Sequence, residues 1–160
     1  THESLVVSWD SLEKRKKELE EIVSKKIPAN SKDIAVARSY GDLRENHEFK
    51  AAKEMQTVLM RRKAELESMI VSAQGTDFSG VKGDVADIGT VVEYQEDGGA
   101  PKKVTILGAW DSDPDNGVIS YQTAVGQALL KKKPGETADL PTEGGGKSKV
   151  RIVSVRPYRT

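Results

Sequence analysis

Residues 52–73 read AKEMQTVLMRRKAELESMIVSA, a glycine-free stretch rich in residues that favour helices. Its apolar side chains recur at a three-four spacing that only Arg62 interrupts: Ala52, Met55, Leu59, Leu66, Met69 and Ala73. Such a heptad pattern places one apolar stripe along a helix, and it is typical of a helix that packs lengthwise on another. We therefore predict a long helix whose stripe faces a second helix.

The second helix is predicted on the N-terminal side of this stretch. Its apolar positions first repeat every seven residues and then drift: Leu5, Leu12, Leu19, Val23, Ile27, Ile34 and Ala37. Pro28 lies in the drift, where a helix should kink or restart, and Asn30 or Ser31 would cap the continuation. We expect residues 8–74 to form an antiparallel coiled-coil hairpin with its tip near residues 40–46.

The short turn between the arms favours pairing within one chain, and hence a monomer. Periodicity alone fits a structural coiled coil, such as an oligomerisation element, about as well as a functional arm.

The second half of the chain has a different period. Residues 75–84 are rich in glycine and small residues and are predicted to be a linker. Beyond them, runs of alternating β-branched residues are separated by turn sequences such as Asp97-Gly98-Gly99 and Pro134-Gly135. The stretch TAVGQALL at 123–130 is predicted to be one short helix. The fold class is therefore α+β, with residues 85–160 forming a small domain of four or five mostly antiparallel strands.

Composition limits the function classes. Lys plus Arg and Asp plus Glu both number 25, so no net charge draws the whole chain onto nucleic acid. The chain has no cysteine, which fits a cytoplasmic location and excludes a zinc finger, and its histidines are only His2 and His47. No apolar run approaches the roughly 20 residues that span a membrane, so we expect no membrane contact.

Residues 37–53 read ARSYGDLRENHEFKAAK, and their centre resembles the GDLxEN tip of the Gre family of transcript-cleavage factors. A second segment, ISYQTAVGQALLKKKPGE at 119–136, is similar to the C-terminal signature of that family. The resemblance covers nearly the whole chain from Leu12 onward. Two departures occur in the second segment: Lys131 replaces an expected glycine, and Gln122-Thr123-Ala124 lacks the usual proline.

The resemblance implies a coiled-coil finger on an FKBP-like domain, and RNA polymerase as the partner. In the family, the globular domain docks at the rim of the secondary channel, and the finger delivers two tip acids to the active site. There the acids help to hold the second catalytic Mg²⁺, shared with the polymerase, and to orient the water that cuts the 3′ end of backtracked RNA. Asp42 and Glu45 match those acids, so the chain would have no tightly bound cofactor and would not be an enzyme by itself.

Two interpretations of these acids follow from the residues alone. Carboxylates at i and i+3 near a helix start lie on one face, where they could complete a Mg²⁺ site whose other ligands belong to a partner. The same spacing is also that of a capping box, with Asp42 as N-cap and Glu45 at the third helical position.

Other residues near the tip are weaker candidates. Arg38, Arg44 and Asn46 are candidate contacts to polymerase acids or RNA phosphate, and Phe49 stands where the family usually has tyrosine. The basic clusters 14–17 and 61–63 are interleaved with glutamates. We interpret them first as solvated ion-pair surfaces and second as a path for weak RNA or DNA contact.

Two alternative functions remain open on the sequence. One is a Gre-like polymerase inhibitor that enters the same channel without promoting cleavage. The other, from a different class, is an FKBP-like chaperone or prolyl-isomerase module, although the second half has few aromatic residues to line a proline pocket.

Overall fold

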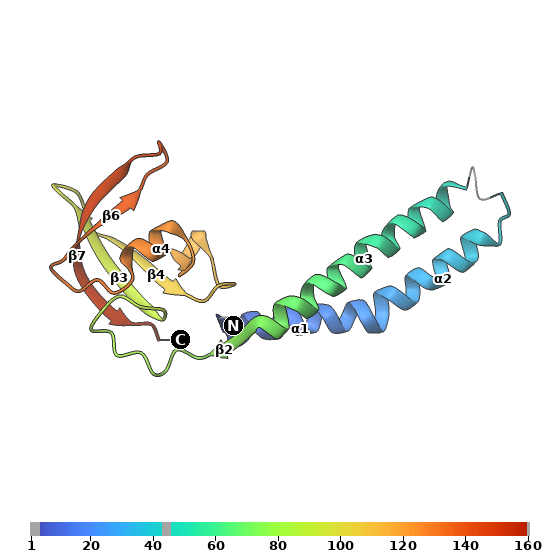
Figure 1. Ribbon diagram of the computed structural model, residues 1–160, viewed down its shortest axis with the longest axis horizontal. Coiled ribbons are helices and arrows are strands. Elements are labelled where there is room, and N and C mark those ends of the chain that lie inside the picture. The colour runs from blue at the N-terminus through green and yellow to red at the C-terminus, as the bar shows by residue number, and fades with distance from the viewer. Residues whose placement is uncertain (1–3, 43–45, 160) are drawn as a thin grey trace. The chain divides into compact units, whose positions relative to one another are not determined.

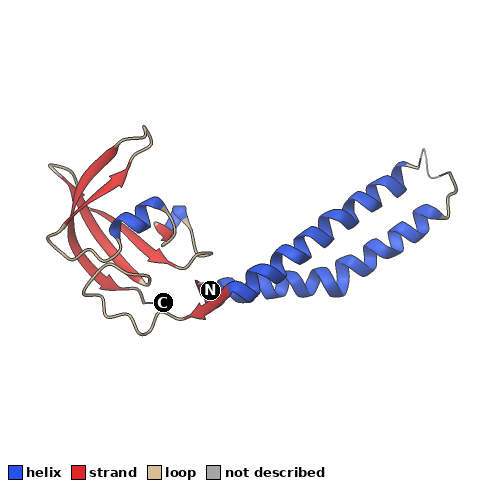
Figure 2. Cartoon of the chain, viewed as in Figure 1, coloured by secondary structure: helices blue, strands red, loops and turns tan. Residues whose placement is uncertain are grey.

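The computed structural model describes residues 4–42 and 46–159. The chain divides into two compact units, one holding residues 12–73 and the other joining residues 4–11 to residues 74–159. Figure 2 shows that the first unit is helical and that the second holds strands joined by loops, with the short helix α4 (Ala124–Leu129). The α+β class, with a helical hairpin followed by a sheet domain, is thus confirmed. The boundaries differ from those drawn on the sequence, because residues 8–11 group with the sheet unit.

The hairpin has two antiparallel arms (Figure 1). The outgoing arm comprises helix α1 (Trp9–Glu21), the π-helical turn η1 (Ile22–Lys26) and helix α2 (Ile27–Arg38). The returning arm is helix α3 (His47–Ser72), whose 26 residues correspond to a length of about 39 Å. The prediction that Leu5 opens the helical repeat was wrong, since Leu5 lies in strand β1 (Leu5–Ser8) and the helix begins at Trp9.

Pro28 lies in the first turn of α2, so a new α-helical segment starts where we predicted a kink or a restart. The arm continues through η1, where the backbone N–H of Ile27 donates to the oxygen of Ile22, five residues back. Proline lacks an N–H, and its ring clashes with the carbonyl four residues earlier in a regular α-helix. The π turn just before Pro28 is the kind of local rearrangement that accommodates such a defect inside a helix.

Most of the predicted seam forms the core of the hairpin, but the predicted Val23 is exposed and its neighbour Ile22 is buried instead. Ile22, Leu59 and Leu66 are buried together, with Leu19, Ile27 and Met69 packed against them. Nearer the tip, Ile34 and Ala37 of α2 are also buried. Met55, a predicted seam position, is half exposed.

The sheet domain contains a five-stranded sheet in the order β5-β4-β3-β7-β6. Its strands are β3 (Thr90–Glu96), β4 (Lys102–Leu107), β5 (Val118–Ser120), β6 (Thr137–Pro141) and β7 (Lys147–Pro157). All neighbours are antiparallel except β4 and β5, which are parallel. Strand β6 was not among the predicted strands. That strand has few β-branched residues but alternates exposed and buried positions.

One face of this sheet holds the core. Alternate residues of the strands, among them Val92, Ile106 and Ile152, pack with Leu129 of helix α4 (Ala124–Leu129) and are almost completely buried. A 3-10 turn, η2 (Pro114–Asn116), precedes β5. On the opposite face, the alternate positions include the exposed side chains of Lys103, Arg151 and Arg156.

The N-terminal strand β1 is anchored to the sheet domain. It pairs with β2 (Ala73–Thr76) in a separate two-stranded sheet, and Val7 is completely buried. The carboxylate of Asp111 accepts hydrogen bonds from the Ser8 N–H (3.0 Å), the Gly108 N–H (2.8 Å) and the hydroxyls of Ser8 and Ser11. A chain segment far from the domain in sequence is therefore part of its packing.

The segment predicted as a linker also packs on the sheet domain. Phe78 is buried, and its ring meets that of Tyr158 edge-on, with centroids 6.1 Å apart. Gly83 lies so close to Pro157 that an added Cβ would come within 2.4 Å of the proline ring. Part of residues 75–84 is thus in contact with the end of β7.

Candidate functional site at the hairpin tip

The tip begins where α2 ends in a tightening turn. The backbone N–H groups of Ser39, Tyr40 and Gly41 donate to carbonyl oxygens of the last turn of α2, at 3.1 to 3.3 Å. Gly41 has φ +98°, a conformation that glycine adopts without the steric penalty of a Cβ. Glycine therefore lets the chain leave the helix axis directly before Asp42.

Asn46 joins the two arms at the tip. Its side-chain oxygen accepts from the Phe49 N–H at 2.9 Å, which makes Asn46 the N-cap of α3. Its side-chain nitrogen donates to the carbonyl oxygen of Ala37, at the end of α2, at 2.6 Å. One amide therefore satisfies an unpaired donor of one helix and an acceptor at the end of the other.

This arrangement overturns the capping-box interpretation. Asp42 does not cap α3, because the helix begins at His47 and Asn46 occupies the cap position. The helical-face argument for Asp42 and Glu45 is wrong for the same reason, since Asp42 precedes the helix. Asparagine caps a helix as well as aspartate does, so the sequence also allowed Asn46 as the N-cap. The Asp-x-x-Glu spacing instead led us to assign the cap to Asp42.

Arg38 and Phe49 form a second contact between the arms. The guanidinium carbon of Arg38 lies 5.7 Å from the centre of the Phe49 ring, within the range of a cation–π interaction. Phe49 is partly buried, and Arg38 is exposed. A phenylalanine at this position therefore serves the tip through its ring, without the hydroxyl of a tyrosine.

Of the two predicted acids, only Asp42 lies within the described residues. Asp42 is exposed in the loop between α2 and α3. Glu45 and Arg44 lie outside the described residues, as does His2. Across residues 4–42 and 46–159, no group of three or more His, Asp or Glu side chains could hold a metal ion.

Polar contacts also link the arms away from the tip. The buried Asn30, which the sequence suggested as a cap, instead donates from its side chain to the carbonyl oxygen of Ala52 on α3 at 2.9 Å. Arg62, the interruption in the seam, forms a two-pronged ion pair with Glu18 of the opposite arm, at 2.6 and 2.9 Å. The hydrogen bond from Arg62 lowers the pKa of the Glu18 carboxyl and raises that of Arg62.

The basic clusters on the arms carry ion pairs, as their first interpretation required. Lys63 pairs with Glu67 at 2.9 Å, and Lys16 with Glu13 at 4.0 Å.

The two departures in the C-terminal signature have distinct structural settings. Lys131 has φ +68°, the left-handed conformation that favours glycine, which is the residue expected there from the family pattern. Thr123 is the N-cap of α4, since its hydroxyl oxygen accepts from the Gly126 N–H at 3.0 Å. Ala124 is then the first helical position, where proline is commonly tolerated because its N–H is not needed.

Both halves of the chain match models of known families. Residues 5–74 match a family described as "Transcription elongation factor, N-terminal", and residues 81–157 match "Transcription elongation factor, GreA/GreB, C-term". A helical hairpin and a sheet domain joined in this order therefore define the chain as a transcription elongation factor. It belongs to the GreA/GreB family.

Individual relatives agree with this assignment. The chain is 41% identical over 133 residues to the transcription elongation factor GreA of Treponema pallidum, covering 82% of each chain. It is 35% identical over 144 residues to that of Leuconostoc citreum, covering 89% of this chain and 90% of the relative.

Among solved structures, it is similar to GreA factor homolog 1 of Thermus thermophilus, with 22% identity and a TM-score of 0.43 over 96% of this chain and 99% of the other. A GreA/GreB factor from Nitrosomonas europaea has 20% identity and a TM-score of 0.42, covering 95% and 97%.

Proposed function

We propose that this chain binds bacterial RNA polymerase through its secondary channel and stimulates cleavage of backtracked RNA. Membership in the GreA/GreB family supports an action in transcript elongation. The observation that carries the more specific proposal is the tip, where an exposed carboxylate at Asp42 stands beside a turn braced from both arms. Asp42 thus places a carboxylate at the end of a narrow helical hairpin.

The chemistry of the tip fits a shared metal ion. Carboxylate oxygens are the ligands that Mg²⁺ prefers, but Asp42 and Glu45 are too few to hold the ion tightly. Bound between these acids and carboxylates of the polymerase, Mg²⁺ would supply charge stabilisation for in-line attack of water on the RNA phosphate. Asp42 and Glu45 would then act in trans, and the chain would not be an enzyme on its own.

The hairpin explains how such acids reach a buried site. A 26-residue helix of about 39 Å carries the tip far from the base of the hairpin. The seam around Leu59 and Leu66 keeps the arms together, and the bonds of Asn30 and Asn46 fix how they lie side by side. An arm stiffened in this way delivers the acids with little loss of orientation, which is what positioning requires.

The flanking candidates receive different proposed roles. Both polar ends of the Asn46 amide are engaged within the chain, so we assign it to positioning the tip rather than to contacting a partner. Arg38 lies against Phe49 while staying exposed, and it can meet an acid or a phosphate with the rest of its guanidinium. Arg44 is proposed as a second such contact.

The prolyl-isomerase or chaperone alternative has no support. Catalytic proline pockets are expected to be apolar and concave. Two cavities on the described part of the sheet domain, of about 310 and 460 Å³, are lined largely by charged and polar residues. The family matches likewise concern transcription elongation in both halves.

A stalled, backtracked elongation complex with labelled RNA tests the proposal. We expect the chain to accelerate RNA shortening in the presence of Mg²⁺ and to leave free RNA intact. Cleavage of naked RNA by the pure chain would contradict the shared-site mechanism. Binding to polymerase without cleavage at any Mg²⁺ concentration would instead identify a Gre-like inhibitor.

A further inference from the structure

The face of the sheet opposite α4 carries a cavity that the tip mechanism does not use. Its volume is about 310 Å³. It lies over the central strand β3 and the strands on either side of it, β4 and β7. The lining residues combine three cations with neutral donors and one buried valine: Lys103, Arg156, Arg159, Thr105, Asn116, Gly117, Tyr158 and Val91.

The three cations of this cavity have no ion-pair partner among the described residues. Lys103, Arg156 and Arg159 are exposed, and none forms an ion pair with another residue in the part of the chain that the structure describes. The nearest acid in the sheet register is Glu93, opposite Lys103, and its carboxylate accepts from the Ser154 hydroxyl at 3.2 Å. In a chain of balanced overall charge, this is a local excess of positive charge.

The backbone holds these cations in fixed places. Arg156 is paired with Val91 in the register of β7 and β3, and Val91 with Thr105 of β4. At the edge of the cavity, the Tyr158 N–H donates to the Gly89 oxygen at 2.7 Å, and the Tyr158 ring packs on Phe78. The site is thus built on paired strands, and binding would cost little ordering of the backbone.

We propose that this cavity binds a backbone phosphate of single-stranded nucleic acid. Arginine forks and a lysine ammonium converging with hydroxyl and amide donors are the groups that bind phosphate oxygens. The centre of a protein interface is usually apolar and poor in charge. Here the only aliphatic side chain in the lining is the buried Val91, so an acidic protein would find no apolar anchor.

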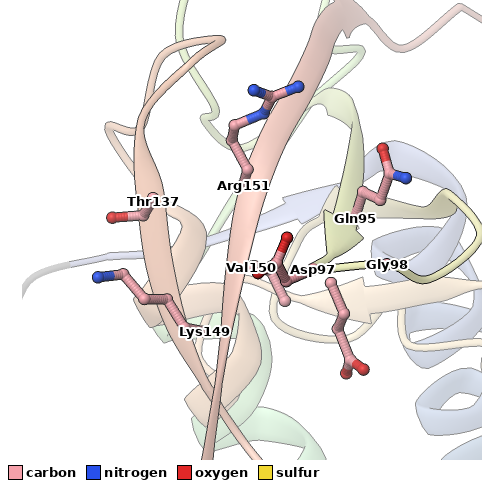
Figure 3. A pocket seen from close by; sticks show the side chains of 8 residues that line it. Gln95, Asp97, Gly98, Thr137, Lys149, Val150 and Arg151 are labelled. Atoms are coloured by element: carbon pink, nitrogen blue, oxygen red, sulfur yellow. The ribbon is translucent and has the colours of Figure 1, made fainter.

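A second cavity on the same domain offers a contrast (Figure 3). It measures about 460 Å³ and is lined by Lys149 and Arg151 of β7, but also by Glu96 at the end of β3 and Asp97 just after it. Figure 3 shows Lys149 and Arg151 on β7 beside Thr137 of β6, with Gln95 and Asp97 across from them. Acids and bases share this cavity, so it should attract a phosphate much less.

The test measures the anisotropy of a short labelled single-stranded RNA against the purified chain, without polymerase, over a range of salt concentrations. The variant Lys103→Gln/Arg156→Gln/Arg159→Gln removes the three cations. The matched control, Lys147→Gln/Lys149→Gln/Arg151→Gln, removes the same charge from the other end of β7. All six side chains are exposed, so unchanged thermal unfolding should confirm that both variants fold.

We expect the first variant to lose at least about tenfold in affinity, and its salt slope to fall by about 0.7 for each phosphate no longer held. The control should stay within about threefold of the parent, and a variant with Lys103→Arg, Arg156→Lys and Arg159→Lys should keep the parent's slope.

Equal losses in both charge-removing variants would overturn the proposal, because only net charge would then matter. Displacement of the RNA by polyglutamate as readily as by unlabelled RNA would reassign the face to an acidic protein. Tighter binding of a duplex through the same residues would overturn the single-strand assignment. Because polymerase is absent, these outcomes are independent of transcript cleavage.

Discussion

In the hairpin the two arms meet along one apolar seam, whereas in the sheet domain the core is closed by strands that are distant in sequence. The buried cluster of the hairpin is small, centred on Ile22, Leu59 and Leu66. Its arms are aligned by a few side-chain contacts, such as those of Asn30 and Asn46. The sheet domain instead has continuous backbone pairing and a larger buried cluster that includes Val92, Ile106 and Ile152.

In the hairpin, the residues that stabilise the fold therefore differ from those proposed to act in RNA cleavage. In the hairpin, a side chain at the tip can change without loss of the seam, so activity and stability should respond to different residues. In the sheet domain, most buried residues contact several strands, so a change in the core should be felt throughout the domain.

The largest effect is expected from the tip acids. The changes Asp42→Asn and Glu45→Gln remove the anionic oxygens that Mg²⁺ needs. Each should lower the rate of RNA cleavage at least about 100-fold, or about 2.7 kcal/mol in activation free energy. Polymerase affinity, measured by competition with the parent, should change little. Because Asp42 is not the N-cap, thermal stability should stay within about 0.5 kcal/mol.

A matched control is available on the same arm. Glu54 is an exposed carboxylate of α3, about two turns beyond the start of the helix. Glu54→Gln makes the same chemical change away from the tip and should leave cleavage unaltered. If the tip amides cleave RNA as well as the parent, the proposed role of Asp42 and Glu45 fails.

The hairpin could be predicted well from the sequence because a seam is a repeating pattern, in which many apolar positions indicate the same face of the helix. Leu59, Leu66 and Met69 were each assigned to the interior from spacing alone, and they are buried or packed on the core. The tip was harder, because a cap depends on a single residue. Asn46 and Asp42 are equally good caps by type, and only the backbone path decides between them.

A middle-sized effect is expected from Asn46. Asn46→Ala loses the cap of α3 and the bond to Ala37, each worth about 1 kcal/mol, so stability should fall by about 2 kcal/mol. The rate of RNA cleavage should also fall, although both acids remain, because the tip loses the hydrogen bonds that hold it in place. Unfolding followed by helical circular dichroism, together with the cleavage assay, measures both effects.

Asn46→Asp separates the two bonds. It keeps an acceptor for the Phe49 N–H but cannot donate to Ala37, so it should lose about half as much stability as the alanine variant. An aspartate variant as unstable as the alanine variant would show that the bond between the arms carries the whole effect.

In the sheet domain, local patterns predicted most strands but not the packing of distant segments. Runs of β-branched residues marked β3, β4, β5 and β7, whereas β6 carries only alternate buried residues, Ala138 and Leu140. The packing of β1 depends on Asp111, about 100 residues away, and the burial of Phe78 on Tyr158. No local pattern encodes contacts at such separations.

A smaller effect, an increase in stability, is expected from a change at Lys131 in the sheet domain. A non-glycine residue in the left-handed region costs about 1–2 kcal/mol, and the extra freedom of glycine in the unfolded chain costs about 0.5–1 kcal/mol. Lys131→Gly should therefore stabilise the chain by about 0.5–1 kcal/mol, since the side chain is exposed. Lys132→Gly, at the next position, has no positive φ to relieve and should destabilise. Chemical denaturation of the two variants compares them directly, and equal shifts would contradict the backbone explanation.

The smallest effect is expected where the arms of the hairpin are joined by charge. Glu18 and Arg62 pair across the seam, but their side chains are 39% and 35% exposed, so solvent screening limits the pair to about 0.5 kcal/mol. Glu18→Gln should destabilise the chain by about that amount at neutral pH. Glu13→Gln is the matched control, because Glu13 pairs only with Lys16 on its own arm, at 4.0 Å. It should change stability by less than about 0.3 kcal/mol.

The pH dependence distinguishes the ion pair from simple packing. Arg62 lowers the pKa of the Glu18 carboxyl in the folded chain, so the pair stabilises fully above the carboxyl's ordinary pKa. That contribution is lost as the pH falls through the lowered pKa, where the folded carboxyl also takes up a proton. Unfolding of the parent and the Glu18→Gln variant should therefore differ at neutral pH and converge in strong acid. A difference that persists in acid would mean that Glu18 joins the arms through its methylenes rather than through its charge.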